Sequence, residues 1–200
     1  MSVMPTMLRA SAQKGGFAEE YRSYRSAREL IHHGSPYRRN QMPLWKVYHP
    51  VGAFTAEDKK ELAKRVTELY ASVPIPRFYV VFMYEEVAKG SCFVGGEPHD
   101  RFVRFRIDQI ARTLPGPVLR EWWIRTLDKV IAPFVKDRGY DWEISIDETP
   151  FDLWSLQGEL PAPFESVAEK RWVKENKASP YTLEEKLPVN LTLRPGIMDR

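Results

Sequence analysis

The sequence predicts an α+β domain in which two strand–helix–strand units form one four-stranded sheet. Two observations carry this prediction. Apolar patterns typical of strands occur in four places, and a segment with helical periodicity lies within each pair of them. Because such crossover connections are right-handed, both helices lie on one face of the sheet. The other face then needs a cover, and in a chain of 200 residues another subunit is the natural one.

The first unit begins at Met42. Residues 44–48 alternate between apolar and polar, as a half-buried strand does. Thr55, followed three residues later by Asp58, forms a variant of the capping box and predicts a helix start. The apolar positions of this helix are Leu62, Val66, Leu69 and Val73. Residues 78–84 form the second strand and are so continuously apolar that we expect both of its faces to be covered.

The second unit follows the turn at Gly95-Gly96. Its first strand contains residues 102–107, and Pro115 introduces a helix that runs to about Lys136. The apolar positions of this helix are Val118, Trp122, Leu127, Ile131 and Phe134. Gly139 suits the end of the helix, and residues 142–146 form the closing strand.

The segments that flank this body differ from it in composition. Residues 1–41 mix Ser, Gly, Arg and Tyr with no sustained apolar period, although a short helix over 18–32 fits the pattern. Seven basic and three acidic residues give this segment a net charge of +4, against +3 for the whole chain. We therefore expect a basic, flexible extension over 1–41, a domain over 42–163 and a C-terminal arm over 164–200. Within the proline-rich arm, residues 166–177 fit a short amphipathic helix.

The composition also excludes several classes of protein. The single Cys92 leaves no internal disulfide, and no run of about eighteen apolar residues could span a membrane. Neither a zinc-type Cys/His cluster nor a strong basic block occurs, so we expect no metal and no nucleic-acid partner. We expect a cytoplasmic protein, or a mitochondrial one if residues 1–41 act as a presequence.

Several short motifs follow one another in an order that can be compared with that of known protein families. They are Pro43-Leu-Trp-Lys-Val-Tyr in the first strand, Thr55 at the helix cap, Gly90-Ser-Cys-Phe-Val-Gly-Gly96 in the central turn, and Trp142 with Glu148-Thr-Pro150 near the closing strand. In this order the sequence over 43–163 resembles the tautomerase superfamily. It looks most like the branch that contains cis-3-chloroacrylic acid dehalogenase and fungal proteins of the oxalocrotonate tautomerase type.

This resemblance implies a homotrimer that works without a metal or organic cofactor, with an amino-terminal proline as the acid–base. Here that residue is Pro43. A free prolyl amine has a pKa near that of an α-amino group, about 8, and an apolar or cationic pocket lowers it. Such an amine moves protons next to a carbonyl group. The resemblance also implies carboxylate binding by Arg112, which falls about where the family has such an arginine. From their place on the preceding strand, we name Arg106 as the second candidate and Arg104 as a further one. Tyr70 stands where the family has a histidine, and it would donate a hydrogen bond.

The sequence also departs from the family. Residue 42 precedes Pro43, and a prolyl nitrogen in a peptide bond is an amide without useful basicity. Either translation starts at Met42, or a protease cleaves before Pro43, or the extension stays in place. The family's tyrosine on the last strand and its water-activating glutamate are also absent. Arg104 and Arg106, two apart on one strand, equally fit a solvated polar face.

Two functional hypotheses follow. The first is keto–enol proton transfer on a small 2-oxo or unsaturated carboxylate, rather than hydration-type dehalogenation. The second is a non-catalytic trimer that serves as a binding or scaffold protein, with the extension blocking the proline.

Overall fold

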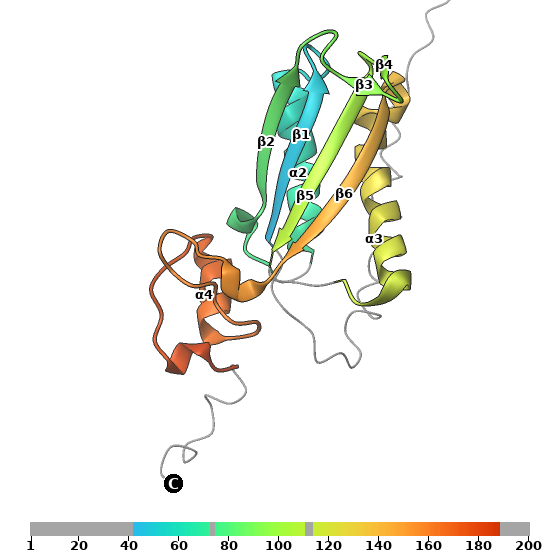
Figure 1. Ribbon diagram of the computed structural model, residues 1–200. Helices are drawn as coiled ribbons and strands as arrows, with labels where there is room; N and C mark the ends of the chain where they lie inside the picture. Colours follow the sequence, from blue (N-terminus) through green and yellow to red (C-terminus); the bar gives the residue numbers. More distant parts are fainter. Residues whose placement is uncertain (1–41, 73–74, 111–113, 189–200) are drawn as a thin grey trace, which may run out of the picture. The chain divides into compact units, whose positions relative to one another are not determined.

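The computed structural model describes residues 42–72, 75–110 and 114–188. Four long strands form one sheet in the order β2-β1-β5-β6 (Figure 1). They are β1 (Met42–Pro50), β2 (Val81–Val87), β5 (Phe102–Ile110) and β6 (Asp141–Thr149). The pairs β1–β2 and β5–β6 are parallel, and β1 and β5 meet antiparallel at the centre. The predicted α+β fold with two tandem β-α-β units is confirmed.

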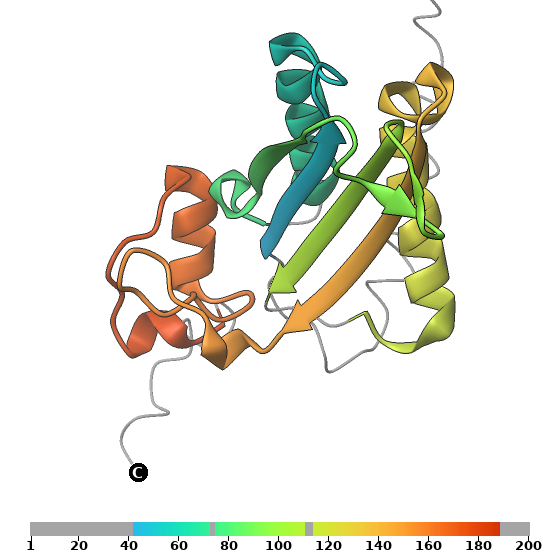
Figure 2. The ribbon, with the colours of Figure 1, turned by 45° about the horizontal axis from the view of Figure 1, so that its top comes forward.

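The two long helices, α2 (Ala56–Ala71) and α3 (Gly116–Ile131), cover the same face of the sheet. Figure 1 shows both behind the strands, and the turned view in Figure 2 agrees. The hydrophobic core lies between this face and the helices. Its fully buried members include Trp45, Val47, Leu62, Val66, Phe105, Ile107, Leu127 and Ile131. The right-handed crossover rule therefore predicted the layering correctly.

The predicted start of the first helix is also confirmed. Thr55 and Asp58 form a reciprocal capping box, with N···O distances of 2.9 and 3.1 Å. Asp58 additionally accepts two hydrogen bonds from the Arg138 guanidinium, at 2.8 and 2.6 Å. This fork ties the start of α2 to the short 3-10 helix η3 (Lys136–Arg138).

The second strand differs from the prediction for residues 78–84. Arg77–Tyr79 form a 3-10 turn, η1, and β2 begins only at Val81. The aromatic residues Phe78 and Tyr79 do not belong to the strand. They pack instead against the rings of Trp154 and Trp172, which come later in the chain. The expectation that both faces of this strand are covered fails within one chain, because Met83 on the face away from the helices is 51% exposed.

The second helix is shorter than predicted. It ends at Ile131, because Pro133 has no N–H for a further helical turn, and the chain continues as η2 (Ala132–Phe134) and η3. Its buried face also differs, because Trp123 is buried where Trp122 was expected. Val118 is 81% exposed, since it lies in the first turn at the end of the core.

The remaining described elements are short. They are the hairpin strands β3 (Phe93–Val94) and β4 (Glu97–Pro98), the 3-10 helices η4 (Phe151–Leu153) and η5 (Glu184–Lys186), and α4 (Val167–Glu175). α4 confirms the helix predicted over 166–177, with Ser166 as its N-cap. The extension over 1–41, with its predicted helix over 18–32, lies outside the described residues. None of the helices in 42–72, 75–110 or 114–188 is long and apolar enough to cross a membrane.

Candidate active site

Pro43 is the second residue of β1, and its side chain is buried. Burial alternates along β1, so Pro43 shares the helix-covered face with Trp45 and His49. Proline is rare in central strands, because it has no N–H to donate to a ladder. The pairing of β1 with β2 begins only at Leu44, so Pro43 lies just outside that ladder.

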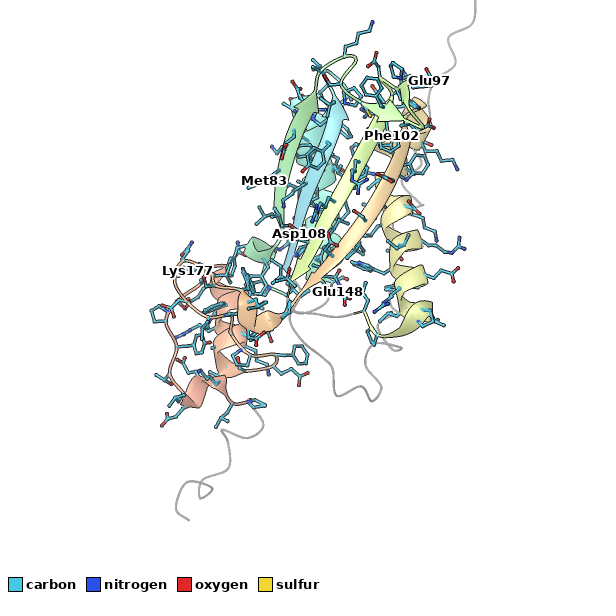
Figure 3. All side chains as sticks on the ribbon, viewed as in Figure 1. Met83, Glu97, Phe102, Asp108, Glu148 and Lys177 are labelled. Atoms are coloured by element: carbon cyan, nitrogen blue, oxygen red, sulfur yellow. The ribbon has the colours of Figure 1, made fainter. Side chains whose placement is uncertain are left out.

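Two polar residues lie beside Pro43 in the same row across the sheet. Pro43 pairs with Gln109 of β5, and Gln109 pairs with Glu148 of β6. Gln109 is fully buried, whereas Glu148, which is labelled in Figure 3, is exposed. Glu148 Oε1 accepts a hydrogen bond of 2.6 Å from the backbone N–H of Leu114. Glu148 thereby holds the residues just before α3 at the Pro43 end of the sheet.

Tyr70, the predicted hydrogen-bond donor, lies on the same side of the sheet as Pro43. It occupies the last turn of α2 and is fully buried, with its ring edge-to-face against Trp123 at 5.2 Å between centroids. Burial is the largest influence on this hydroxyl and raises the pKa of Tyr70. The phenol therefore keeps its proton at neutral pH and is suited to donate to a carbonyl or carboxylate oxygen.

Arg104 and Arg106 lie on the opposite, open face of the sheet. Both are exposed, and both contact carboxylates on their own face. Arg106 lies 3.1 Å from Asp147 Oδ2 and 3.5 Å from Asp108 Oδ1, and Arg104 contacts Glu143. Asp108 is labelled on this face in Figure 3. Within one subunit the structure does not bring these arginines to Pro43.

Arg112, the first choice for carboxylate binding, lies outside the described residues. The connection that contains it joins Ile110, at the end of β5, to Leu114. Both of these residues lie at the end of the sheet where Pro43 begins β1, because Met42 pairs with Ile110. The role of Arg112 therefore stays a prediction.

Sequence reasoning gave no role in the site to Trp45, Gln109, Trp123 or Glu148, although Trp45 and Glu148 stand in the motifs that carry the resemblance. One of them carried a usable signal. Gln109 is polar at a position where the alternation of β5 calls for an apolar residue, after Phe105 and Ile107. The positions of the other three depend on strand register and helix rotation. The apolar pattern of the sequence fixes neither of these to within one residue.

Residues 154–176, which follow β6, pack against η1, just before β2 begins. Tyr79 contacts Trp154 and Trp172 edge-to-face, with centroids 5.1 and 6.4 Å apart. The backbone N–H of Phe78 donates to Asn176 Oδ1 at 2.9 Å. Because Val81 pairs with Leu44, this aromatic cluster lies near the row that contains Pro43.

Comparisons with known proteins agree with this architecture. The model of a family described as "Putative oxalocrotonate tautomerase enzyme" matches residues 42–177. No curated protein matches the chain. A crystal structure of native RhCC from Rhodococcus jostii is 45% identical, covers 69% of this chain and 99% of its own, and superposes with a TM-score of 0.67.

Two further structures extend the comparison. One, described as a probable enzyme from the fungus Aspergillus fumigatus, is 34% identical, covers 71% of this chain and 99% of its own, and has a TM-score of 0.67. A member of the cis-3-chloroacrylic acid dehalogenase family shares the fold at 19% identity and a TM-score of 0.53, covering 74% of this chain and 95% of its own. The chain therefore belongs to the family of putative oxalocrotonate tautomerases, within the tautomerase superfamily.

Proposed function

We propose that this protein is a tautomerase-like isomerase that transfers a proton on a small 2-oxo or unsaturated carboxylate, with Pro43 as the acid–base and no cofactor. The observation that carries the proposal is the burial of Pro43 on the helix-covered face, in one row with Gln109. A secondary amine placed there is partly desolvated, which disfavours its charged form and lowers its pKa. The neutral amine is then available as a base near neutral pH.

The proposal requires a free prolyl nitrogen. While residue 42 is attached, the nitrogen of Pro43 is an amide and carries no proton to exchange. Initiation at Met42 followed by removal of the methionine would free it, and so would cleavage before Pro43. The family match begins at residue 42, which supports a functional unit that starts at this point.

We also propose how the substrate carboxylate is held. Arg112 would bind it bidentately, and Tyr70 would donate to a second oxygen. Arg106 and Arg104 would take part only if the open face of one subunit meets the Pro43 end of a neighbour. Such an arrangement is compatible with the homotrimer that we propose, in which a second subunit covers the open face.

Turnover tests the proposal directly. Ketonisation of phenylenolpyruvate is compared between the full chain, a chain that starts at Pro43, and the Pro43→Ala variant of that shorter chain. We expect turnover from the chain that starts at Pro43, and at least a hundredfold less from its alanine variant. Pro98→Ala, in the exposed hairpin, is the matched control and should retain full activity. Equal turnover with and without Pro43 would refute the proline mechanism.

A second candidate function rests on the sequence in front of Pro43. If residues 1–41 stay attached, the protein is a non-catalytic trimer that binds a partner, with its proline blocked. Intact mass of the protein from its native source separates the two. A mass of 23.3 kDa, that of the full chain, supports the binding protein. The lower mass of a chain that begins at Pro43 supports the enzyme.

A further inference from the structure

Three aromatic side chains that carry polar hydrogens meet on the helix-covered side of the sheet. Trp45 comes from β1, Tyr70 from the last turn of α2 and Trp123 from α3. Their side chains are 0, 0 and 6% exposed. Within the described part of the chain, the indole nitrogens of Trp45 and Trp123 and the hydroxyl of Tyr70 all lack a hydrogen bond of good geometry.

Two other tryptophans of the described chain do have a hydrogen-bond partner for their indole N–H. The indole N–H of Trp142 donates to Asp128 Oδ1 at 3.0 Å, and that of Trp172 donates to the carbonyl oxygen of Ser179 at 2.9 Å. Buried polar groups in proteins are generally paired, because leaving one unpaired forfeits its hydration without compensation. Three such groups in one place therefore call for an explanation.

The indoles of Trp45 and Trp123 both act on the hydroxyl oxygen of Tyr70. The N–H groups of Trp45 and Trp123 both favour the ionised form of the Tyr70 hydroxyl, as donors facing its oxygen do, although neither contact reaches full hydrogen-bond geometry. Burial opposes them and outweighs them, so Tyr70 stays protonated. An indole N–H only donates, whereas a hydroxyl both donates and accepts. The proton of Tyr70 is consequently the one that this cluster offers to an outside acceptor.

We propose that Trp45, Tyr70 and Trp123 form a donor set that binds one oxygen of a small 2-oxo carboxylate. Tyr70 donates to that oxygen, and the two tryptophans are positioning residues that orient the hydroxyl and strengthen it as a donor. The choice of ligand rests on the proposed function, because Pro43 lies two residues before Trp45 on the same face, about 7 Å along the strand. The donor set adds two indoles that the resemblance does not name.

Binding of phenylpyruvate to the full chain tests this proposal without requiring turnover. The indole N–H signals are followed by NMR of ¹⁵N-tryptophan-labelled protein and assigned with single Trp→Phe variants. We expect phenylpyruvate to shift the signals of Trp45 and Trp123, and to leave those of Trp142 and Trp172 in place. Unmoved signals from Trp45 and Trp123 at saturating phenylpyruvate would overturn the proposal.

Variants separate positioning from packing. Tyr70→Phe keeps the ring and removes the donor, and should raise the Kd for phenylpyruvate about tenfold. Trp123→Phe should raise it when Tyr70 is present and have no further effect in the Tyr70→Phe background, as expected if it acts through Tyr70. Trp142→Phe is the matched control and should leave the Kd unchanged. Equal losses from Trp123→Phe in both backgrounds would overturn the positioning role.

The same titration with Pro43→Ala distinguishes the two proposals. If the indole signals still shift while the chain that starts at Pro43 shows no proline-dependent turnover, the donor set stands and the proline mechanism fails. If turnover depends on Pro43 but the indole signals do not move, the proline mechanism stands and the donor set fails.

Discussion

The helix-covered face of the sheet and its open face use the same four strands but present opposite chemistry. The covered face buries Pro43, Trp45 and Gln109, whereas the open face carries Arg106 in an ion-pair network with Asp108 and Asp147. Neighbouring residues of one strand therefore differ completely in environment. The candidate acid–base Pro43 and the candidate carboxylate ligands Arg104 and Arg106 come from paired strands, yet they lie on opposite sides of one subunit.

The largest effect that tests this contrast is a change in core packing. Trp45→Ala should lower the free energy of unfolding by about 3–5 kcal/mol, because it leaves a cavity under the helices. Met83→Ala on the open face should cost less than about 1 kcal/mol in the isolated subunit. Urea denaturation measures both values. If Met83→Ala costs as much as Trp45→Ala, the open face is covered in solution and the contrast holds only for one chain.

The next effect concerns His49, which is fully buried at the far end of β1 on the covered face. Its Nδ1 lies 2.9 Å from the carbonyl oxygen of Pro50, and burial is the main reason why its pKa falls below the ordinary 6.5. The unfolded chain therefore binds a proton at a higher pH than the folded protein does. Protonation of His49 should therefore not reduce the free energy of unfolding above pH 6.5. Below that pH the free energy of unfolding should decline, by up to about 1.4 kcal/mol per pH unit.

Unfolding free energies between pH 7.5 and 5 measure this decline. His49→Gln removes the titrating group and should flatten the curve in that window. A wild-type curve that is already flat, or a decline that persists in His49→Gln, would contradict the assignment.

A smaller effect compares two ion pairs. Asp58→Ala removes both a capping-box partner and the fork from Arg138, and should cost about 1–2 kcal/mol. Asp147→Ala on the open face should cost less than about 1 kcal/mol, and less still in high salt. The Arg138 fork lowers the pKa of Asp58, so its contribution persists at neutral pH and is lost only as the pH falls below the ordinary 3.8. Chemical denaturation at pH 7 and pH 3 checks both claims.

The smallest expected effect is that of Arg106→Gln on stability, within about 0.5 kcal/mol, because the side chain is half exposed. Its effect on the KM for phenylenolpyruvate, in the chain that starts at Pro43, is the informative measurement. An unchanged KM places Arg106 on a solvated face. A KM raised tenfold or more would show that the open face of one subunit joins the site of another.

Much of the fold could be predicted from local patterns, and the reason is physical. The alternation in residues 44–48 and the Thr55–Asp58 cap depend on neighbours in sequence, and both are observed. Phe78 and Tyr79 looked like strand residues because packing against Trp172, which lies far along the chain, requires the same apolar types as a buried strand.

The site was less predictable for a related reason. The pairing of Gln109 with Pro43 is a matter of sheet register, and the burial of Trp123 in place of Trp122 is a matter of helix rotation. A register or a helix rotation that differs by one residue uses the same amino acids. The pattern of a single sequence therefore does not determine either one.

The most direct test of the central claim is the ionisation of the Pro43 nitrogen itself. ¹⁵N-proline NMR of the chain that starts at Pro43 follows this nitrogen across pH, with the full chain as the control. We predict one titration with a pKa below about 8, the ordinary value of an α-amino group, and no titration of Pro43 in the full chain. A pKa at or above that value in the shorter chain would show that the site does not make Pro43 a better base near neutral pH, and would contradict the account.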